Sequence, residues 1–252
     1  MGIAIVQSLP QDQWRHFVEV HPASNIFQTP EMFEVFGRVK GHRSELWAAV
    51  EADQVLALLL PVRVTLMEGL LSRFTTRAIA YGSVLYAPGV KGKTALNLLL
   101  QTLRQEAEGQ LLFTELRNLT DLEDVQPILD EQGFLYEDHL NYLVDLDRPP
   151  KDILQSMGKR TRKNIRRGLR KGEVSITEAQ SLDQVGVCYD LLCETYHLAG
   201  VPLADRSLFD AAFEVLYPKG MVRFTLAWVD QAPAATSVEL LYKDRVYGWY
   251  GG

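Results

Sequence analysis

The sequence predicts a mixed α/β fold built from two similar modules in tandem, residues 1–147 and 148–252. Three observations support this prediction. Apolar runs typical of buried strands, such as residues 55–64, alternate with amphipathic helical patterns, such as residues 94–108. A strand–turn–strand pattern occurs twice along the chain. Between the two halves, the sequence Asp147-Arg-Pro-Pro is unsuited to strand pairing and is placed as the domain boundary.

The bulk composition is that of an average globular protein. The 252 residues are 47% hydrophobic and 23% charged, with a formal net charge of −6. A pI near 5.4 argues against a general nucleic-acid coat protein. Two cysteines, Cys188 and Cys193, form neither a disulfide framework nor a zinc site, so we expect no metal and a reducing, cytoplasmic compartment. The N-terminus lacks the basic flank of a signal peptide, and the longest apolar run is too short for a membrane span.

The first module is expected to alternate strands and helices. Strands are predicted at residues 3–6, 46–50, 55–64, 78–85, 111–116 and 142–146, with a tight turn over residues 51–54. Helices are predicted after Pro10, after Thr29-Pro30, over residues 94–108, and after Asp124 as a capping residue. Gly82 falls inside the 78–85 strand, where a glycine indicates a bulge or the close approach of a ligand or backbone.

The second module is expected to begin with a helix and continue with strands and helices. Strands are predicted at residues 174–177, 222–229 and 235–242, the last two joined by a turn over residues 230–233. The pair Ser181 and Gln184 predicts a capping box that opens a helix through Tyr196. Asp205 is predicted to open another helix, which Pro218-Lys-Gly220 ends.

The most unusual stretch of the chain is residues 159–171, K-R-T-R-K-N-I-R-R-G-L-R-K. Eight of these thirteen residues are Lys or Arg and none is acidic. Such a block repels itself unless something anionic compensates it. Apolar or small residues recur at helical spacing through it: Leu154, Met157, Thr161, Ile165 and Leu169. We therefore expect a docked helix whose cationic outer face binds an anion; the alternative is a solvated helix paired with the acidic rest of the protein.

The two halves of the chain repeat one another. The sequence Leu46-Trp-Ala-Ala-Val-Glu-Ala-Asp-Gln resembles Leu226-Ala-Trp-Val-Asp-Gln-Ala-Pro, and Tyr81-Gly82 resembles Tyr247-Gly248. This pattern is typical of a duplicated α/β module, although any two buried hairpins look alike. The first half continues far beyond Gly82, whereas only four residues follow Gly248. We therefore expect the second module to be incomplete and the natural protein to be longer.

Standard catalytic signatures are absent. The sequence contains no G-x-x-x-x-G-K-[ST], G-x-S-x-G, H-E-x-x-H or G-x-G-x-x-G motif, and its five histidines are scattered. The acyl-CoA signature [RQ]-x-x-G-x-[GA] is matched only in its first half, at Gln155-Ser-Met-Gly158 and at Arg245-Val-Tyr-Gly248.

Five short motifs stand in order along the chain: Phe27-Gln-x-Pro-Glu31, Tyr81-Gly82, Lys159-x-x-Arg-Lys-Asn-Ile-Arg-Arg167, Thr195-Tyr196 and Leu240-Leu-Tyr-Lys-Asp-Arg-Val-Tyr-Gly248. Together they resemble the FemABX family of aminoacyl transferases and related acyltransferases of GNAT-like fold. The basic motif is the most specific of them. The resemblance implies two GNAT-like modules, as the internal repeat also indicates. Family members normally continue past the Tyr-Gly strand with a helix and further strands, so the resemblance also implies that the second module is incomplete.

The resemblance implies transfer of an acyl or aminoacyl group to an amine. In the best-known branch, the donor is aminoacyl-tRNA and the acceptor is a peptidoglycan precursor that carries a phosphate-linked carrier. The side chains expected to bind substrate are Lys159, Arg162, Lys163, Arg166, Arg167, Tyr81, Tyr196 and Tyr247, with the basic ones gripping phosphate. Glu239 is the candidate general base, Tyr250 a candidate for the proton path, and the amides of residues 235–239 candidate donors to the carbonyl oxygen. Packing in the core is the alternative role for the two tyrosines Tyr247 and Tyr250.

The chain also departs from the family pattern. Met32 and Phe36 stand where the family often has Trp and a phosphate-gripping Lys; Arg38 or Lys40 could replace the latter. The acceptor could therefore be an amino sugar or another small amine of a polysaccharide. The donor stays open between aminoacyl-tRNA and acyl-CoA, with no bound cofactor expected. Two further interpretations are a non-catalytic binding module for an anionic ligand, and a peripheral membrane or RNA contact at the inner face of the membrane.

Overall fold

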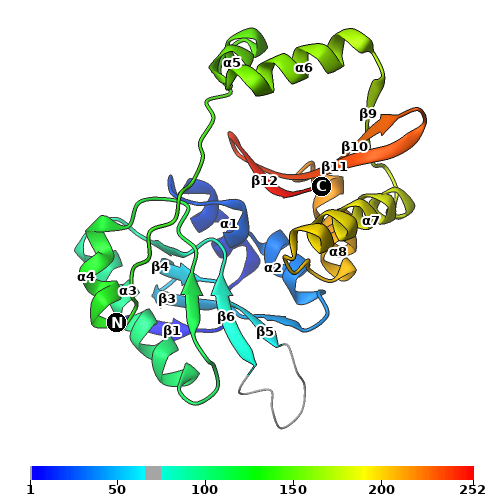
Figure 1. Cartoon of the computed structure of the whole chain (residues 1–252). Coiled ribbons are helices and arrows are strands. Elements are labelled where there is room, and N and C mark those ends of the chain that lie inside the picture. The colour runs from blue at the N-terminus through cyan, green and yellow to red at the C-terminus, as the bar shows by residue number, and fades with distance from the viewer. Residues whose placement is uncertain (1, 66–74) are drawn as a thin grey trace. The chain divides into compact units, whose positions relative to one another are not determined.

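The computed structural model describes residues 2–65 and 75–252, which pack as two compact units (Figure 1). The chain passes between the units repeatedly. The first unit comprises residues 1–137, 205–221 and 242–244, and the second comprises residues 138–204, 222–241 and 245–252. These units do not follow the predicted modules 1–147 and 148–252, which were defined by the linker at Asp147-Arg-Pro-Pro and by the internal repeat rather than by packing. That division stays a prediction.

The first unit is built on an antiparallel sheet in the order β1-β3-β4-β7. Its strands are β1 (Ala4–Val6), β3 (Trp47–Glu51), β4 (Gln54–Leu59) and β7 (Val84–Tyr86). Helix α1 (Gln11–Val20) lies on one face of this sheet and α3 (Val90–Ala107) on the other (Figure 1). Trp14 and Val18 of α1 pack on the first face, and a row of leucines of α3 packs on the second. The sheet is thus covered on both faces, as the apolar runs of its strands predict.

A second sheet of the first unit has the order β2-β5-β6-β8. Its strands are β2 (His42–Ser44), β5 (Val62–Thr65), β6 (Thr76–Ala80) and β8 (Thr114–Leu116). Two predicted strands are wrong, because each is divided between the two sheets. The run 55–64 breaks at Pro61, which has no N–H for a ladder, and the run 78–85 breaks at the turn Tyr81–Ser83, where Ser83 has φ +58°.

Short helices complete the first unit. Helix α2 (Pro30–Gly37) begins as predicted, since the Thr29 side chain accepts a hydrogen bond from the N–H of Met32. Asp205 caps α8 (Arg206–Leu216) in the same way. Asp124 does not cap α4 (Gln126–Glu131); its carboxylate instead accepts from Tyr86 and Lys93, because it lies inside the preceding turn η3 (Glu123–Val125). The other short turns are η1 (Ile26–Gln28) and η4 (Tyr217–Lys219).

The second unit contains a four-stranded sheet in the order β12-β11-β10-β9. Its strands are β9 (Val174–Glu178), β10 (Val222–Val229), β11 (Ala232–Tyr242) and β12 (Arg245–Gly251). Helix α7 (Leu182–Ala199) lies on one side of this sheet (Figure 1) and buries Val185, Cys188 and Leu192. Helices α5 (Pro150–Ser156) and α6 (Lys159–Lys171) precede β9. Residues 142–146, predicted as a strand, have no regular secondary structure and are exposed.

The topology supports the predicted duplication. In each half a strand and two helices precede three strands that join the first strand in one sheet, β1-β3-β4-β7 and β9-β10-β11-β12, although β2, β5 and β6 also lie along this part of the first half. The matching hairpins β3–β4 and β10–β11 even carry a register shift at corresponding places, after Ala49 and after Ala227. The second helix of each half, α2 and α8, pack against one another within the first unit, where Arg38 pairs with Glu214 at 3.1 Å.

The repeated Tyr-Gly dipeptides are not structurally equivalent. Tyr81-Gly82 lies in the turn before β7, whereas Tyr247-Gly248 lies inside β12.

The carbonyl of Gly82 accepts hydrogen bonds from Asn25 Nδ2 at 3.1 Å and Gln28 Nε2 at 2.8 Å. A side chain at this position would meet both residues, since a Cβ at Gly82 would lie 2.6 Å from Asn25 Oδ1. The close approach indicated by the glycine is therefore that of η1.

Substituting the two glycines should separate these roles. Gly82→Ala should lower the free energy of unfolding by about 2 to 3 kcal/mol, because the new methyl group overlaps a buried hydrogen-bond network. Gly248→Ala, where no atom lies within 4 Å of the added Cβ, should change it by less than about 0.5 kcal/mol. Urea unfolding followed by tryptophan fluorescence measures both; equal losses would contradict the assignment.

Candidate functional site

The basic stretch forms α6 with the bounds that the sequence predicts, Lys159–Lys171. Gly172 ends the helix in the left-handed region at φ +64°, where glycine has no steric penalty. Met157 and Gly158 are extended, however, and separate α5 from α6. The predicted apolar stripe therefore does not lie on one helix, because Leu154 belongs to α5 and Met157 to the link.

The predicted docking of this helix is wrong, since α6 buries none of its residues and Leu169 is 75% exposed. The physical reason is its composition. Ile165 and Leu169 are its only large apolar side chains, and their burial would also take neighbouring cations out of water.

Most cations of α6 have no counterion within the described residues 2–65 and 75–252. Lys171 pairs with Glu173 at 3.1 Å, Arg162 donates to the carbonyl of Gln155 at 2.7 Å, and Arg170 donates to the carbonyl of Arg166. No carboxylate in that part of the chain forms an ion pair with the others, which are Lys159, Arg160, Lys163, Arg166 and Arg167. The helix thus presents a cationic surface that protein carboxylates leave largely uncompensated.

Aromatic side chains of β12 meet α7 at Tyr196. The ring of Tyr250 lies 6.0 Å from that of Tyr196, and Trp249 packs edge-on against Tyr250 at 5.2 Å. The fold thus brings together two of the predicted residues, Tyr196 and Tyr250. Tyr247 lies on the same strand, three residues before Tyr250.

The two predicted catalytic residues, Glu239 and Tyr250, are not brought together. Alternate residues of β11 are buried under α7, and a side-chain hydrogen bond joins Thr236 to Cys188 of α7. Glu239 has the opposite parity and projects from the other face, where its carboxylate accepts from Thr225 Oγ1 at 3.3 Å. Tyr250, by contrast, reaches α7. One acceptor amine cannot contact both faces of the sheet.

The amides of residues 235–239 are part of the sheet. The N–H of Thr236 donates to the carbonyl of Gly252 at 2.6 Å, and the N–H of Gly252 returns the bond at 2.9 Å. On its other side β11 pairs with β10 from Ala232 to Leu240. The prediction that this segment offers donors to a carbonyl oxygen is therefore wrong for Thr236, whose amide is already engaged.

In the first unit, two motifs of the family resemblance meet directly. Gln28, from the Phe-Gln-x-Pro-Glu motif, donates to the carbonyl of Gly82. Next to it, the ring of Tyr81 stacks on Phe36 at 4.8 Å, and the guanidinium of Arg117 lies 4.9 Å from the same ring. Burial raises the pKa of Tyr81, and the nearby Arg117 partly offsets this effect. Sequence reasoning missed Arg117, which belongs to a short connection after β8.

The acidic residue of the same motif is a buried anchor. Glu31 is 3% exposed, and its Oε1 accepts from both Arg15 and Lys219 at 2.7 Å. Burial pushes the pKa of Glu31 up, but the hydrogen bonds from Arg15 and Lys219 outweigh burial and hold it below the ordinary value. The proposed replacement for the family's lysine, Arg38, is engaged with Glu34 and Glu214.

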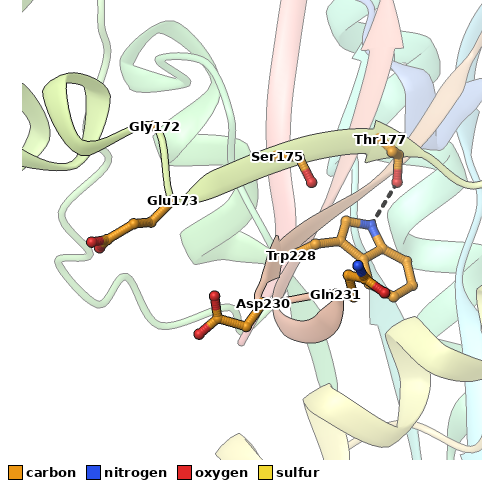
Figure 2. A pocket seen from close by; sticks show the side chains of 7 residues that line it. All are labelled: Gly172, Glu173, Ser175, Thr177, Trp228, Asp230 and Gln231. Carbon is orange, nitrogen blue, oxygen red and sulfur yellow. Dashed lines mark hydrogen bonds between the residues drawn. The ribbon is translucent and has the colours of Figure 1, made fainter.

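An open hollow of about 480 Å³ lies at the end of the second unit's sheet, beside β9 (Figure 2). Trp228 Nε1 donates to Thr177 Oγ1 at 2.8 Å, which fixes the indole (Figure 2). The hollow is lined by Gly172, Glu173, Ser175, Thr177, Trp228, Asp230 and Gln231. None of the predicted site residues lines the hollow. Sequence reasoning missed Trp228, because a tryptophan near the end of a strand can equally well lie in the core.

Comparisons with known proteins identify the class of fold. Residues 155–252 match a family model described as an acetyltransferase (GNAT) domain. No curated protein matches the chain. The crystal structure of FemX is similar over 100% of this chain and 80% of its own, with a TM-score of 0.67 and 13% identity. A conserved protein of unknown function from Bacteroides thetaiotaomicron is similar over 94% of this chain and 75% of its own, with a TM-score of 0.51 and 14% identity.

These findings confirm the mixed α/β fold with GNAT-like modules. The chain has the fold of GNAT-like acyltransferases, and its FemABX-like character, predicted from the sequence, is confirmed at the level of the fold by the likeness to FemX. The predicted acyltransferase class agrees with the domain match, which leaves the donor undetermined. Among the described residues, no helix has the length and apolar character to span a membrane, and no group of His, Cys, Asp and Glu could hold a metal ion.

The two partial acyl-CoA signatures do not lie at strand-to-helix loops. Gln155 to Gly158 joins two helices, α5 and α6, and Arg245 to Gly248 lies inside β12. Backbone amides at a helix N-terminus that follows a strand are suited to binding a diphosphate, whereas amides within a ladder are occupied. Neither sequence is therefore in a position to bind the diphosphate of acyl-CoA in that way.

Replacing the buried carboxylate should reveal its contribution to stability. Glu31→Gln should lower the free energy of unfolding at neutral pH by about 1.5 to 3 kcal/mol, because the charged hydrogen bonds from Arg15 and Lys219 to the buried carboxylate are lost. Since the folded pKa of Glu31 lies below its unfolded value, its contribution is present above the unfolded pKa and is lost as the pH falls through the folded pKa. Urea unfolding at a series of pH values below neutrality should show this acid-dependent component in the wild type and lack it in the variant.

Glu34→Gln is the matched control. Glu34 also belongs to α2 and pairs with an arginine, but it is 52% exposed. Its loss should cost less than about 1 kcal/mol. A variant Glu31→Gln as stable as this control would show that the shared ion pair contributes little.

Proposed function

We propose that the protein transfers an activated acyl or aminoacyl group to an amine of a phosphate-bearing cell-envelope precursor, such as a peptidoglycan peptide or a polysaccharide. The carrying observation is the exposed cationic helix α6, which lies entirely within the segment that matches the acetyltransferase domain. Arginine forks bind phosphate in bidentate fashion and lysines act as point charges. Lys159, Arg162, Lys163, Arg166 and Arg167 are the proposed phosphate ligands.

Acyl-CoA is the donor that the acetyltransferase domain favours. Because neither partial acyl-CoA signature lies at a strand-to-helix loop, we propose that the donor binds in another way than through that signature. Aminoacyl-tRNA is the second candidate donor. Its phosphates would interact with the same kind of cationic surface. Donor trials should therefore include acyl-CoA and an aminoacyl-adenosine that lacks most of the tRNA phosphates.

Tyr196 and Tyr250 are proposed to form a wall of the acceptor site. Tyr247 lies three residues before Tyr250 on β12 and therefore on the other face of the strand, where it is proposed as a substrate contact that goes with Glu239. Tyr81, in the first unit, is a separate proposed substrate contact. The phenol of Tyr250 would accept or relay the proton that leaves the amine. Glu239 is retained as a proposed general base. Because it projects from the opposite face of β11, its role and that of Tyr250 are alternatives.

A triple substitution tests the phosphate role. Arg162→Ala, Arg166→Ala and Arg167→Ala together should abolish binding of a phosphate-bearing acceptor, because each charge-assisted hydrogen bond contributes about 1.5 to 3 kcal/mol. The fold should persist, since α6 buries none of its residues. Calorimetry with a uridine diphosphate amino sugar measures the affinity, and Arg104→Ala on α3 is the control. Unchanged affinity in the triple variant would remove the proposed role of the helix.

Turnover by Glu239→Gln and Tyr250→Phe distinguishes the two proton acceptors. Loss of a general base should lower kcat by about a hundredfold or more with little change in acceptor affinity. Only one of the two variants is expected to show this loss. Acceptor binding by the wild type without turnover by any donor would instead identify a non-catalytic binding module.

A further inference from the structure

Helix α6 has two chemically different sides. At helical spacing, Ile165 and Leu169 fall on one side, with Thr161 one turn before them and Gly168 beside them. The eight Lys and Arg residues occupy the remaining surface. The helix is therefore amphipathic as well as cationic, a combination that phosphate binding alone does not require.

Neither side is satisfied by the described part of the protein. Leu169 is 75% exposed, Met157 just before the helix is 38% exposed, and Ile165 is only partly covered. On the cationic side, Lys163 and Arg167 are among the residues that form no ion pair within residues 2–65 and 75–252. An occupant of α6 has to supply negative charge and an apolar environment together.

Two classes of polyanion differ in this respect. A nucleic acid would neutralise the cations but would leave Ile165 and Leu169 in water. An anionic bilayer offers phosphates at its surface and hydrocarbon just beneath, and long Lys and Arg side chains can reach the phosphates while a helix lies in the interface. We propose that α6 lies on an anionic lipid bilayer, with Ile165 and Leu169 at the boundary between head groups and acyl chains.

Electrostatic attraction contributes more to the free energy of this contact than burial of apolar side chains does. Each Lys or Arg near an anionic leaflet strengthens binding about fivefold, and there are eight of them, whereas two apolar side chains can enter the interface. Such a contact weakens as salt screens the charges. It requires neither donor nor acceptor, so its failure would leave the proposed transfer reaction untouched, and failure of the reaction would leave the contact untouched.

Co-sedimentation of the full chain with vesicles tests the proposal. Binding is expected to vesicles of phosphatidylcholine mixed with phosphatidylglycerol, and not to phosphatidylcholine alone, and should decline as salt is raised. Ile165→Ser with Leu169→Ser should weaken binding about tenfold without changing the charge. Lys163→Gln with Arg167→Gln should weaken it about 25-fold.

The control is Val90→Ser with Leu198→Ser, which removes two apolar side chains from α3 and α7 whose exposure, 82% and 86%, compares with that of Leu169. It should bind vesicles as the wild type does.

Equal binding to neutral vesicles, or wild-type affinity in the Ile165/Leu169 variant, would overturn the proposal. Binding to RNA that survives loss of those two side chains, together with no binding to the mixed vesicles, would identify a nucleic-acid surface instead. A fall in melting temperature of the Ile165/Leu169 variant would show that these side chains are packed in the protein, which would also overturn it.

Discussion

The first unit depends on one buried carboxylate. Glu31 lies at the start of α2 and accepts hydrogen bonds from Arg15 on α1 and from Lys219, which follows α8. An isolated buried charge is costly, so the two cations and the carboxylate stabilise one another only in this arrangement. The ion pair between Glu31 and Lys219 joins residues 188 positions apart in the sequence. It thereby helps to fix residues 205–221 within a unit otherwise formed mainly by the first half of the chain.

The packing of α2 against α8 gives the duplication a physical meaning. Each half of the chain contains a four-stranded sheet of the same strand order, and the second helix of each half contributes to the same unit. The second half of the chain therefore contributes one of its helices, α8, to the first unit. This explains why units found by packing differ from modules found by sequence repetition, although both descriptions concern the same elements.

Local sequence signals predicted the elements whose boundaries are determined by local chemistry. Helix α6 matches its predicted bounds because Gly172 stops it, and α2 begins at Pro30 because Thr29 caps it. The division of strands at Pro61 and at Ser83 was missed, because it depends on which sheet each segment joins. The docking of α6 was also predicted wrongly, since helical spacing says that a side is apolar but not that another surface covers it.

The candidate site was less predictable than the fold for the same reason. Tyr196 and Tyr250, both named as candidates from the sequence, meet between a helix and a strand, whereas Glu239 projects from the other face of the sheet. The register of β11 decides this, because a shift of one residue would exchange its two faces. Arg117 and Trp228 lack any local pattern, and only tertiary contacts single them out.

The route of the chain has a mechanical consequence. Residues 205–221 and 242–244 leave the second unit and return to it, so no single cut of the backbone can release the two units from each other. Stretching or local melting of β10 and β11 pulls on α8 at one end and on the Lys243 turn at the other. Lys243 Nζ is held there by the carbonyl of His21 at 3.0 Å and Ser24 Oγ at 2.7 Å. We therefore expect the two units to unfold together in one cooperative transition.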